Sequence, residues 1–148
     1  MSINIAKLLI EIKSVNFSFE KHFTLTSGLK SPVYVDCRRI MSFVNEREII
    51  FKKAISYFND NNINFDTIAG GETAGIPYAA FLSNKLNKPM IYIRKKPKGF
   101  GINKQIEGNF EKNQNVILVE DLATDGGSKI IFVNALREAG LKVKDIFV

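Results

Sequence analysis

Two adjacent acidic residues, Glu120 and Asp121, directly follow an apolar run at residues 116–119. A short turn with Thr124, two glycines and Ser128 comes next and opens a helical pattern. In an open parallel sheet, ligands bind where strands end and helices begin. The amides and hydroxyls of such a turn can donate hydrogen bonds to a phosphate, aided by the helix dipole. Because the two acids would repel a bare phosphate, we expect them to face sugar hydroxyls, a metal ion or a developing positive charge.

A basic segment offers a second place for chemistry. Five Lys and Arg residues lie between positions 94 and 104 without an acid, and a long polar stretch covers residues 95–115. A loop of that length in a compact domain is usually functional or disordered. Taken alone, the segment could equally be a solvated face or a nucleic-acid patch. In the same way, the glycine-rich turn at residues 70–75 could be no more than a tight connection.

The elements that must position these residues follow from periodicity and turn signals. The pattern predicts helices over residues 3–15, 45–60, 78–86 and 128–139. It predicts strands over residues 23–25, 33–36, 66–69, 90–94, 116–119 and 142–148, with a turn at residues 27–32. Strands and helices alternate from residue 45 onward, which favours an α/β fold with a parallel sheet flanked by helices.

Composition narrows the class of protein only slightly. A chain of 148 residues is long enough for one domain with a real core. Its 21 Lys and Arg against 15 acids favour an anionic partner, whether nucleic acid, a membrane surface or a phosphorylated small molecule. A single cysteine excludes an internal disulfide and fits a reducing cytosol. Charges within residues 1–13 argue against a signal peptide or a membrane span, so we expect a cytoplasmic protein.

Residues 116–128 resemble the phosphoribosyl-diphosphate signature of the type I phosphoribosyltransferases: an apolar strand, two acids and a Thr/Gly/Ser loop before a helix. Three further segments are similar to the orotate phosphoribosyltransferases in particular. Residues 23–36 look like their N-terminal hood, residues 70–77 like their pyrophosphate-binding turn, and residues 94–108 like their mobile catalytic loop. The resemblance covers roughly residues 20–148 in the family order.

This resemblance implies a glycosyltransferase, and specifically a pentosyltransferase. The reaction would transfer ribose 5-phosphate from phosphoribosyl diphosphate to orotate, giving orotidine 5′-monophosphate and pyrophosphate in de novo pyrimidine (UMP) biosynthesis. It implies one phosphoribosyltransferase domain, with residues 1–40 as the hood region and residues 41–148 as the core. It also implies a homodimer in which loop 94–108 acts in the neighbouring subunit's site, with no nucleic-acid or membrane partner.

The resemblance assigns roles to individual residues. It gives catalytic roles to Lys95, Lys98 and Asp121, and it places orotate near Tyr34, Val35 and Thr124. Residues expected to bind phosphoribosyl diphosphate come from the turn, the basic loop and the signature: Gly71, Glu72, Thr73, Arg94, Lys95, Lys98, Phe100, Glu120, Asp121, Leu122, Ala123, Thr124, Asp125, Gly126, Gly127 and Ser128. The implied cofactor is Mg²⁺, held mainly by pyrophosphate and with no direct protein ligand assigned. Glu120 and Asp121 are the acids that could lie near it.

The chain departs from the family pattern in several places. Many orotate enzymes carry Lys where Thr26 and Ala74 stand, and His or Tyr where Phe100 stands, so a phosphate contact at 26 or 74 would come from backbone. Family members also continue past residues 142–148 into further core strands and an Arg that binds the orotate carboxylate. We therefore expect a chain truncated at its C-terminus, with those strands missing.

Two rival functions remain open at this point. The first is a phosphoribosyltransferase for another base, against which the hood and the loop at residues 94–101 argue. The second is a non-catalytic phosphoribosyl-diphosphate sensor or RNA-binding regulator of the same fold. Such a protein would be expected to lose loop lysines or signature acids, yet Lys95, Lys98, Glu120 and Asp121 are all present.

Overall fold

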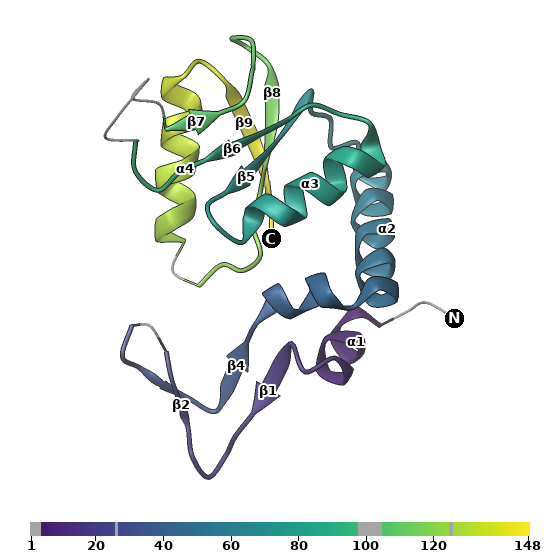
Figure 1. The fold of residues 1–148 in the computed structure, drawn as a ribbon, viewed down its shortest axis with the longest axis vertical. Coiled ribbons are helices and arrows are strands. Elements are labelled where there is room, and N and C mark those ends of the chain that lie inside the picture. The colour runs from purple at the N-terminus through teal and green to yellow at the C-terminus, as the bar shows by residue number, and fades with distance from the viewer. Residues whose placement is uncertain (1–3, 26, 98–104, 125) are drawn as a thin grey trace. The chain divides into compact units, whose positions relative to one another are not determined.

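The computed structural model describes residues 4–25, 27–97, 105–124 and 126–148 (Figure 1). The chain forms two compact units, Met1–Lys52 and Lys53–Val148. The boundary between them falls inside one helix, α2 (Val44–Asp60). Among the described residues, no helix has both the length and the apolar character needed to cross a bilayer.

The first unit contains short elements. Helix α1 (Ile5–Glu11) is followed by two antiparallel strand pairs and a 3₁₀ helix (Cys37–Ser42). Strand β1 (Val15–Phe17) pairs with β4 (Val33–Val35), and β2 (Phe23–Thr24) pairs with β3 (Lys30–Ser31). The helix predicted over residues 3–15 is therefore shorter, and the predicted turn at 27–32 contains a strand.

The early end of α1 has a local cause. Lys13 adopts a left-handed backbone conformation, with φ of 56°, and a residue in that conformation cannot continue an α-helix. The apolar residues that follow at helical spacing, including Val15, lie instead in β1. Spacing of apolar residues alone does not reveal such a stop when the residue is neither Gly nor Asn.

A five-stranded sheet forms the centre of the second unit. Its order is β7 (Ile106–Glu107), β6 (Met90–Ile93), β5 (Thr67–Gly71), β8 (Asn115–Val119) and β9 (Lys142–Phe147). The last four are mutually parallel, whereas β7 runs antiparallel to β6. The α/β prediction is confirmed, with β7 as a short edge strand inside the polar stretch.

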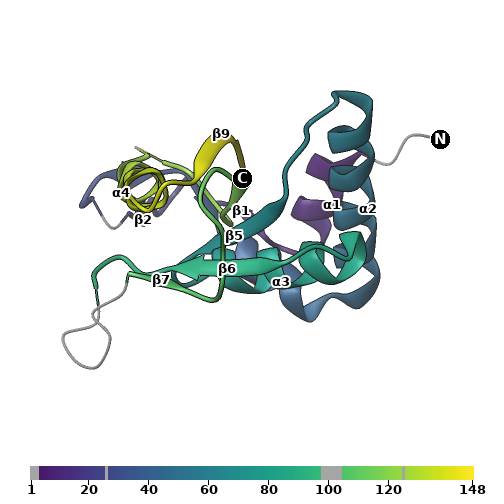
Figure 2. The ribbon, with the colours of Figure 1, turned by 90° about the horizontal axis from the view of Figure 1, so that it is seen from above.

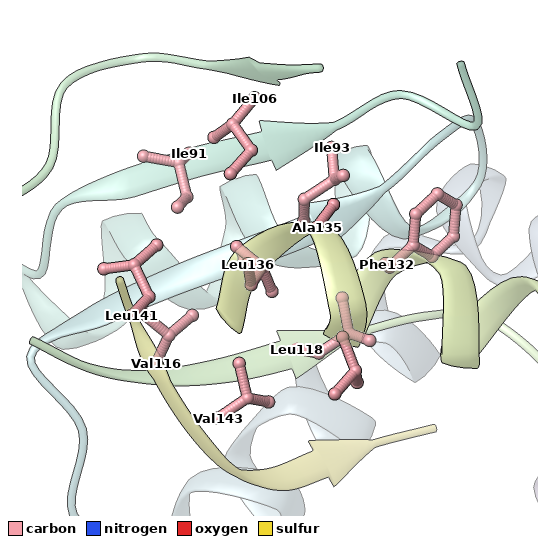
Figure 3. Close-up of a cluster of buried hydrophobic side chains, with 12 residues drawn as sticks. Ile91, Ile93, Ile106, Val116, Leu118, Phe132, Ala135, Leu136, Leu141 and Val143 are labelled. Carbon is pink, nitrogen blue, oxygen red and sulfur yellow. The ribbon is translucent and has the colours of Figure 1, made fainter. Parts of the chain in front are cut away.

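Helices cover both faces of this sheet (Figure 2). Helix α4 (Gly127–Glu138) buries Phe132 and Leu136 completely in an apolar cluster on one face (Figure 3). Burying one such side chain contributes about 1.5–3 kcal/mol. On the opposite face, α3 (Gly75–Leu86) lies so close to β5 that a Cβ on Gly70 would be 3.0 Å from the Ala79 Cβ. A glycine in β5 therefore lets α3 approach the sheet.

The β8–β9 ladder contains one irregularity. Val116 pairs with Val143 but Ile117 pairs with Asp145, so Lys144 is an extra residue on β9. Beyond this bulge the strand continues to Phe147, whose ring packs edge-on against Phe58 of α2 at 5.2 Å between centroids.

Candidate active site at the carboxyl edge of the sheet

Three of the segments that the sequence singles out meet at one edge of the sheet. Strands β6, β5 and β8 are parallel neighbours, with Gly71 opposite Ile93 and Gly70 opposite Val119. Because their carboxyl ends lie together, so do the residues that follow them. The basic segment begins after β6, the glycine-rich turn begins at the end of β5, and the acid pair and loop of the signature follow β8.

Glu120, the first signature acid, points its carboxylate into the protein. The residue is only 5% exposed, and its Oε2 lies 2.8 Å from the Lys129 Nζ of α4. A Cβ added to Gly71 would lie 2.2 Å from Glu120 Oε1, and one added to Gly75 would lie 2.6 Å from the same atom. The two glycines of the β5–α3 turn therefore leave the space that this carboxylate occupies.

Opposing effects act on the ionisation of Glu120. Burial raises its pKa above the ordinary value of 4.5, and the charge of Asp121 acts in the same direction. The hydrogen bond and the charge of Lys129 lower the pKa, as does the more distant charge of Lys95. Burial is the largest of these influences, so the net shift is upward.

Lys129 joins three parts of the site. Besides Glu120, its Nζ donates to the backbone carbonyl oxygen of Leu122 in the signature loop. It also lies 3.3 Å from Ser128 Oγ in the first turn of α4. One side chain thus connects the end of β8, the loop and the helix.

Asp121 is placed differently from its neighbour. It is half-buried, and within the described ranges its carboxylate has neither an ion-pair nor a hydrogen-bond partner. Thr124 is exposed in the same loop. Of the two signature acids, Asp121 is therefore the one with a carboxylate available to a ligand.

The start of α4 suits an anion. Gly126 precedes the helix with φ of 78°, a left-handed conformation that glycine adopts without strain. None of the residues in the first turn is acidic, so no side chain there offsets the positive end of the helix dipole. A phosphate at residues 126–128 would meet backbone amides and the Ser128 hydroxyl.

The glycine-rich turn is tied to the basic segment. The Glu72 N–H donates to the Ile93 carbonyl at 2.8 Å, and Glu72 Oε2 accepts from the Lys95 N–H at 2.9 Å. Arg94 places Nη1 3.7 Å from Glu72 Oε1 and Nε 3.1 Å from Glu107 Oε1. The hydrogen bond to Glu107 raises the pKa of the Arg94 guanidinium above its ordinary value. The peptide between Glu72 and Thr73 is cis.

The structure brings together most of the predicted diphosphate-binding residues but not every predicted site residue. Lys98, Phe100 and Asp125 lie outside the described residues. Tyr34 and Val35 belong to β4 of the first unit, where the Tyr34 ring packs against Phe23 at 5.5 Å.

Sequence reasoning missed Lys129 and Glu107. A signal for Lys129 existed, because a lysine in the first turn of a helix opposes the dipole and needs a compensating acid. For Glu107 the sequence offers no comparable signal. Among the described residues, no group of three or more His, Cys, Asp or Glu side chains is placed to hold a metal ion.

Parallel strands that end in an acid and a phosphate-type loop define an α/β protein whose carboxyl edge is suited to a phosphorylated ligand. Residues 44–147 match the family described as the phosphoribosyl transferase domain, and the chain belongs to that family. Its fold is that of the type I phosphoribosyltransferases.

Named relatives agree with this assignment. The chain is 51% identical to the orotate phosphoribosyltransferase of Cereibacter sphaeroides over 91% of this chain and 59% of that protein. The crystal structure of orotate phosphoribosyltransferase from Aeropyrum pernix superposes with a TM-score of 0.79 at 28% identity, covering 97% of this chain and 78% of that one. Leishmania donovani UMP synthase gives 0.78 at 33% identity, over 96% and 30%. The chain spans about three fifths of the length of the curated relatives it matches.

Proposed function

We propose that this protein is an orotate phosphoribosyltransferase acting in de novo pyrimidine (UMP) biosynthesis. It would transfer ribose 5-phosphate from phosphoribosyl diphosphate to orotate, giving orotidine 5′-monophosphate and pyrophosphate. The observation that carries the proposal is the half-buried Asp121 carboxylate, which has no ion-pair or hydrogen-bond partner among the described residues and lies beside a loop and helix start suited to phosphate. Support for orotate as the base comes from relatives about half identical over nine tenths of this chain.

The geometry suggests how Asp121 would contribute. As the bond between C1 of the ribose and the pyrophosphate oxygen breaks, positive charge develops on the sugar ring before an orotate nitrogen bonds to C1. A carboxylate fixed beside that ring lowers the barrier, because it is already oriented where charge develops. The 5′-phosphate would occupy residues 124–128 at the start of α4, with Thr124 close to both substrates.

Departing pyrophosphate would need cations, and the basic segment supplies them. Arg94 and Lys95 lie at the end of β6, next to the turn formed by Gly71, Glu72 and Thr73. Lys98 and Phe100 belong to the same segment by resemblance. A highly charged pyrophosphate would compete with Glu72 and Glu107 for Arg94, since those ion pairs are partly open to solvent.

Magnesium is the cofactor that this reaction implies, and the described acids fit a weakly attached ion. Of the two signature acids, Asp121 has the uncommitted carboxylate among the described residues, because Glu120 is engaged by Lys129. Mg²⁺ commonly binds one or two carboxylates and takes its other oxygen ligands from phosphates and water. When bound, the ion would neutralise charge on the leaving pyrophosphate.

A homodimer and a cytoplasmic location complete the proposal. Loop 94–108 would act in the partner's site, and Tyr34 and Val35 would contact orotate. We expect Lys98→Ala to inactivate, and mixing it with Asp121→Asn subunits to restore activity by rebuilding one intact site per mixed dimer. Recovery is measured after subunit exchange is verified by mass spectrometry. Complete exchange without any recovery argues against action in trans.

The direct test is an ultraviolet assay of orotate consumption with phosphoribosyl diphosphate and Mg²⁺, run beside adenine, hypoxanthine and uracil. Consumption of orotate alone supports the proposal. Consumption of another base would identify a different phosphoribosyltransferase. Tight binding of phosphoribosyl diphosphate without turnover of any base would instead identify a sensor.

A further inference from the structure

Lys129 occupies a position that is unfavourable for a cation unless the site uses it. Its side chain is only 12% exposed, and it lies in the first turn of α4, where the helix dipole repels positive charge. A buried ammonium group also loses hydration that must be replaced by close partners. Glu120 and the Leu122 carbonyl provide those partners.

These two partners lie on either side of Asp121. Glu120 directly follows β8, and Leu122 follows Asp121 in the loop, so the Lys129 ammonium spans the backbone on both sides of Asp121. A bridge of this kind restricts the backbone that carries the Asp121 carboxylate. The Lys129 ammonium also neutralises the charge of Glu120. Of the two acids, only Asp121 then presents a negative charge near the expected phosphate.

We propose that Lys129 is a positioning residue: by holding Glu120 and the Leu122 carbonyl together, it fixes the loop that presents Asp121 to the ribose of phosphoribosyl diphosphate. This inference rests on the proposed function, which supplies the ligand. Because its ammonium group is already engaged by Glu120 and the Leu122 carbonyl, Lys129 acts through the loop geometry.

The test compares Lys129→Met with Lys53→Met, which removes the same charge from an exposed position on α2. Binding of phosphoribosyl diphosphate with Mg²⁺ is measured by calorimetry from pH 5 to 8, well below the melting temperature. We expect Lys129→Met to weaken binding about tenfold, the scale of one charge-assisted hydrogen bond. Lys129→Arg should recover part of the affinity, and Lys53→Met should bind as the wild type does. Wild-type affinity in folded Lys129→Met overturns the inference.

A ligand-free measurement separates this inference from the proposed function. Amide hydrogen exchange of the loop at residues 121–124 is followed by NMR without ligand. It should be faster in Lys129→Met than in the wild type or in Lys53→Met, because the bridge from Glu120 to the Leu122 carbonyl is lost. Unchanged exchange overturns the inference even if substrate binds. Failure of the wild type to bind phosphoribosyl diphosphate overturns the proposed function alone, since the exchange result still reports whether Lys129 holds the loop.

Lys129→Met could fail to fold, because it leaves a buried acid unpaired. The double variant Glu120→Gln with Lys129→Met removes both charges and avoids that cost. We expect it to fold and still to bind the diphosphate more weakly than the wild type, since the Leu122 carbonyl has lost its donor. Wild-type affinity in the double variant also overturns the inference.

Discussion

Two ion-paired regions lie at the same edge of the sheet, and they differ in how firmly they are held. The Glu120–Lys129 pair has side chains 6% and 12% exposed, and glycines enclose the carboxylate. Arg94 shares its charge between Glu72 and Glu107, with side chains 27%, 31% and 23% exposed. Breaking a buried pair leaves an uncompensated charge, whereas a solvent-exposed pair contributes little. The first region is thus a fixed support, and the second can exchange partners with an anion.

Among the substitutions considered, we expect the largest loss of turnover from one at Asp121, the acid next to the fixed Glu120–Lys129 pair. Asp121→Asn should lower turnover in the orotate assay by about a hundredfold or more, because it removes a placed charge from the developing cation. The melting temperature should stay near that of the wild type. Asp60→Asn, at the exposed end of α2, is the matched control. Turnover close to wild type in Asp121→Asn would show that the acid pair is structural.

The fixed region can be broken sterically by Gly75→Ala. A Cβ there would lie 2.3 Å from the Val119 carbonyl oxygen as well as against Glu120. Glycine to alanine in a helix ordinarily stabilises, yet here we expect a loss of about 1–3 kcal/mol in urea unfolding from overpacking. Gly126→Ala, with no atom within 4 Å of its added Cβ, should show only the strain of its positive φ, about 1–2 kcal/mol. A stabilised Gly75→Ala would mean that the glycines do not confine the carboxylate.

The raised pKa of Glu120 gives a pH signature for the same region. The folded state holds the Glu120 proton more tightly than the unfolded chain does, so this residue stabilises the fold below pH 4.5. That contribution is lost as the pH rises from 4.5 through the folded-state pKa. Glu120→Gln should therefore remove this decline, and its unfolding free energy should rise relative to wild type across that window. Parallel curves for the two proteins would mean that the pKa of Glu120 is not raised.

The smallest effect is expected in the exchangeable region. Glu107→Gln removes one partner of Arg94 and should change the unfolding free energy by no more than about 1 kcal/mol, because the pair is partly open to solvent. Affinity for pyrophosphate should rise slightly, by about twofold to threefold, because a competitor for the guanidinium is lost. Titration calorimetry at low salt measures the change, with Glu111→Gln as an exposed control. A large loss of stability would place Glu107 in the fixed region instead.

The sheet could be predicted from sequence where apolar runs are long and flanked by clear turns. Residues 116–119 and 90–94 are examples, and both lie in strands within one residue of the predicted ends. Strands β1 and β3 could not be predicted in this way. They are only two or three residues long, which is too short for an alternating pattern to show. In addition, β1 pairs with β4, which lies beyond the hairpin of β2 and β3.

For the candidate site, the order of residues in the sequence was enough to predict the acids, the loop and the turn. It did not show that Glu120 and Asp121 have different roles. Both are acids at a strand end and look equivalent in sequence. Their difference arises from Gly71 and Gly75, more than forty positions earlier in the chain, and from Lys129 on the next helix. Only the fold brings these groups together.

The bulge in β9 has a consequence for how the family can vary in length. Lys144 is the extra residue, and it allows Val143 to join the α4 cluster while Phe147 reaches Phe58 on the opposite face. In a regular strand, side chains four positions apart point to the same side, and the extra residue reverses that relation for positions 143 and 147. If Lys144 were deleted and Asp145 kept its pairing with Ile117, Val143 would stay opposite Val116 and every later residue would keep its face. Position 144 is therefore where β9 can lose a residue, whereas a deletion at position 143 or 145 removes a paired side chain.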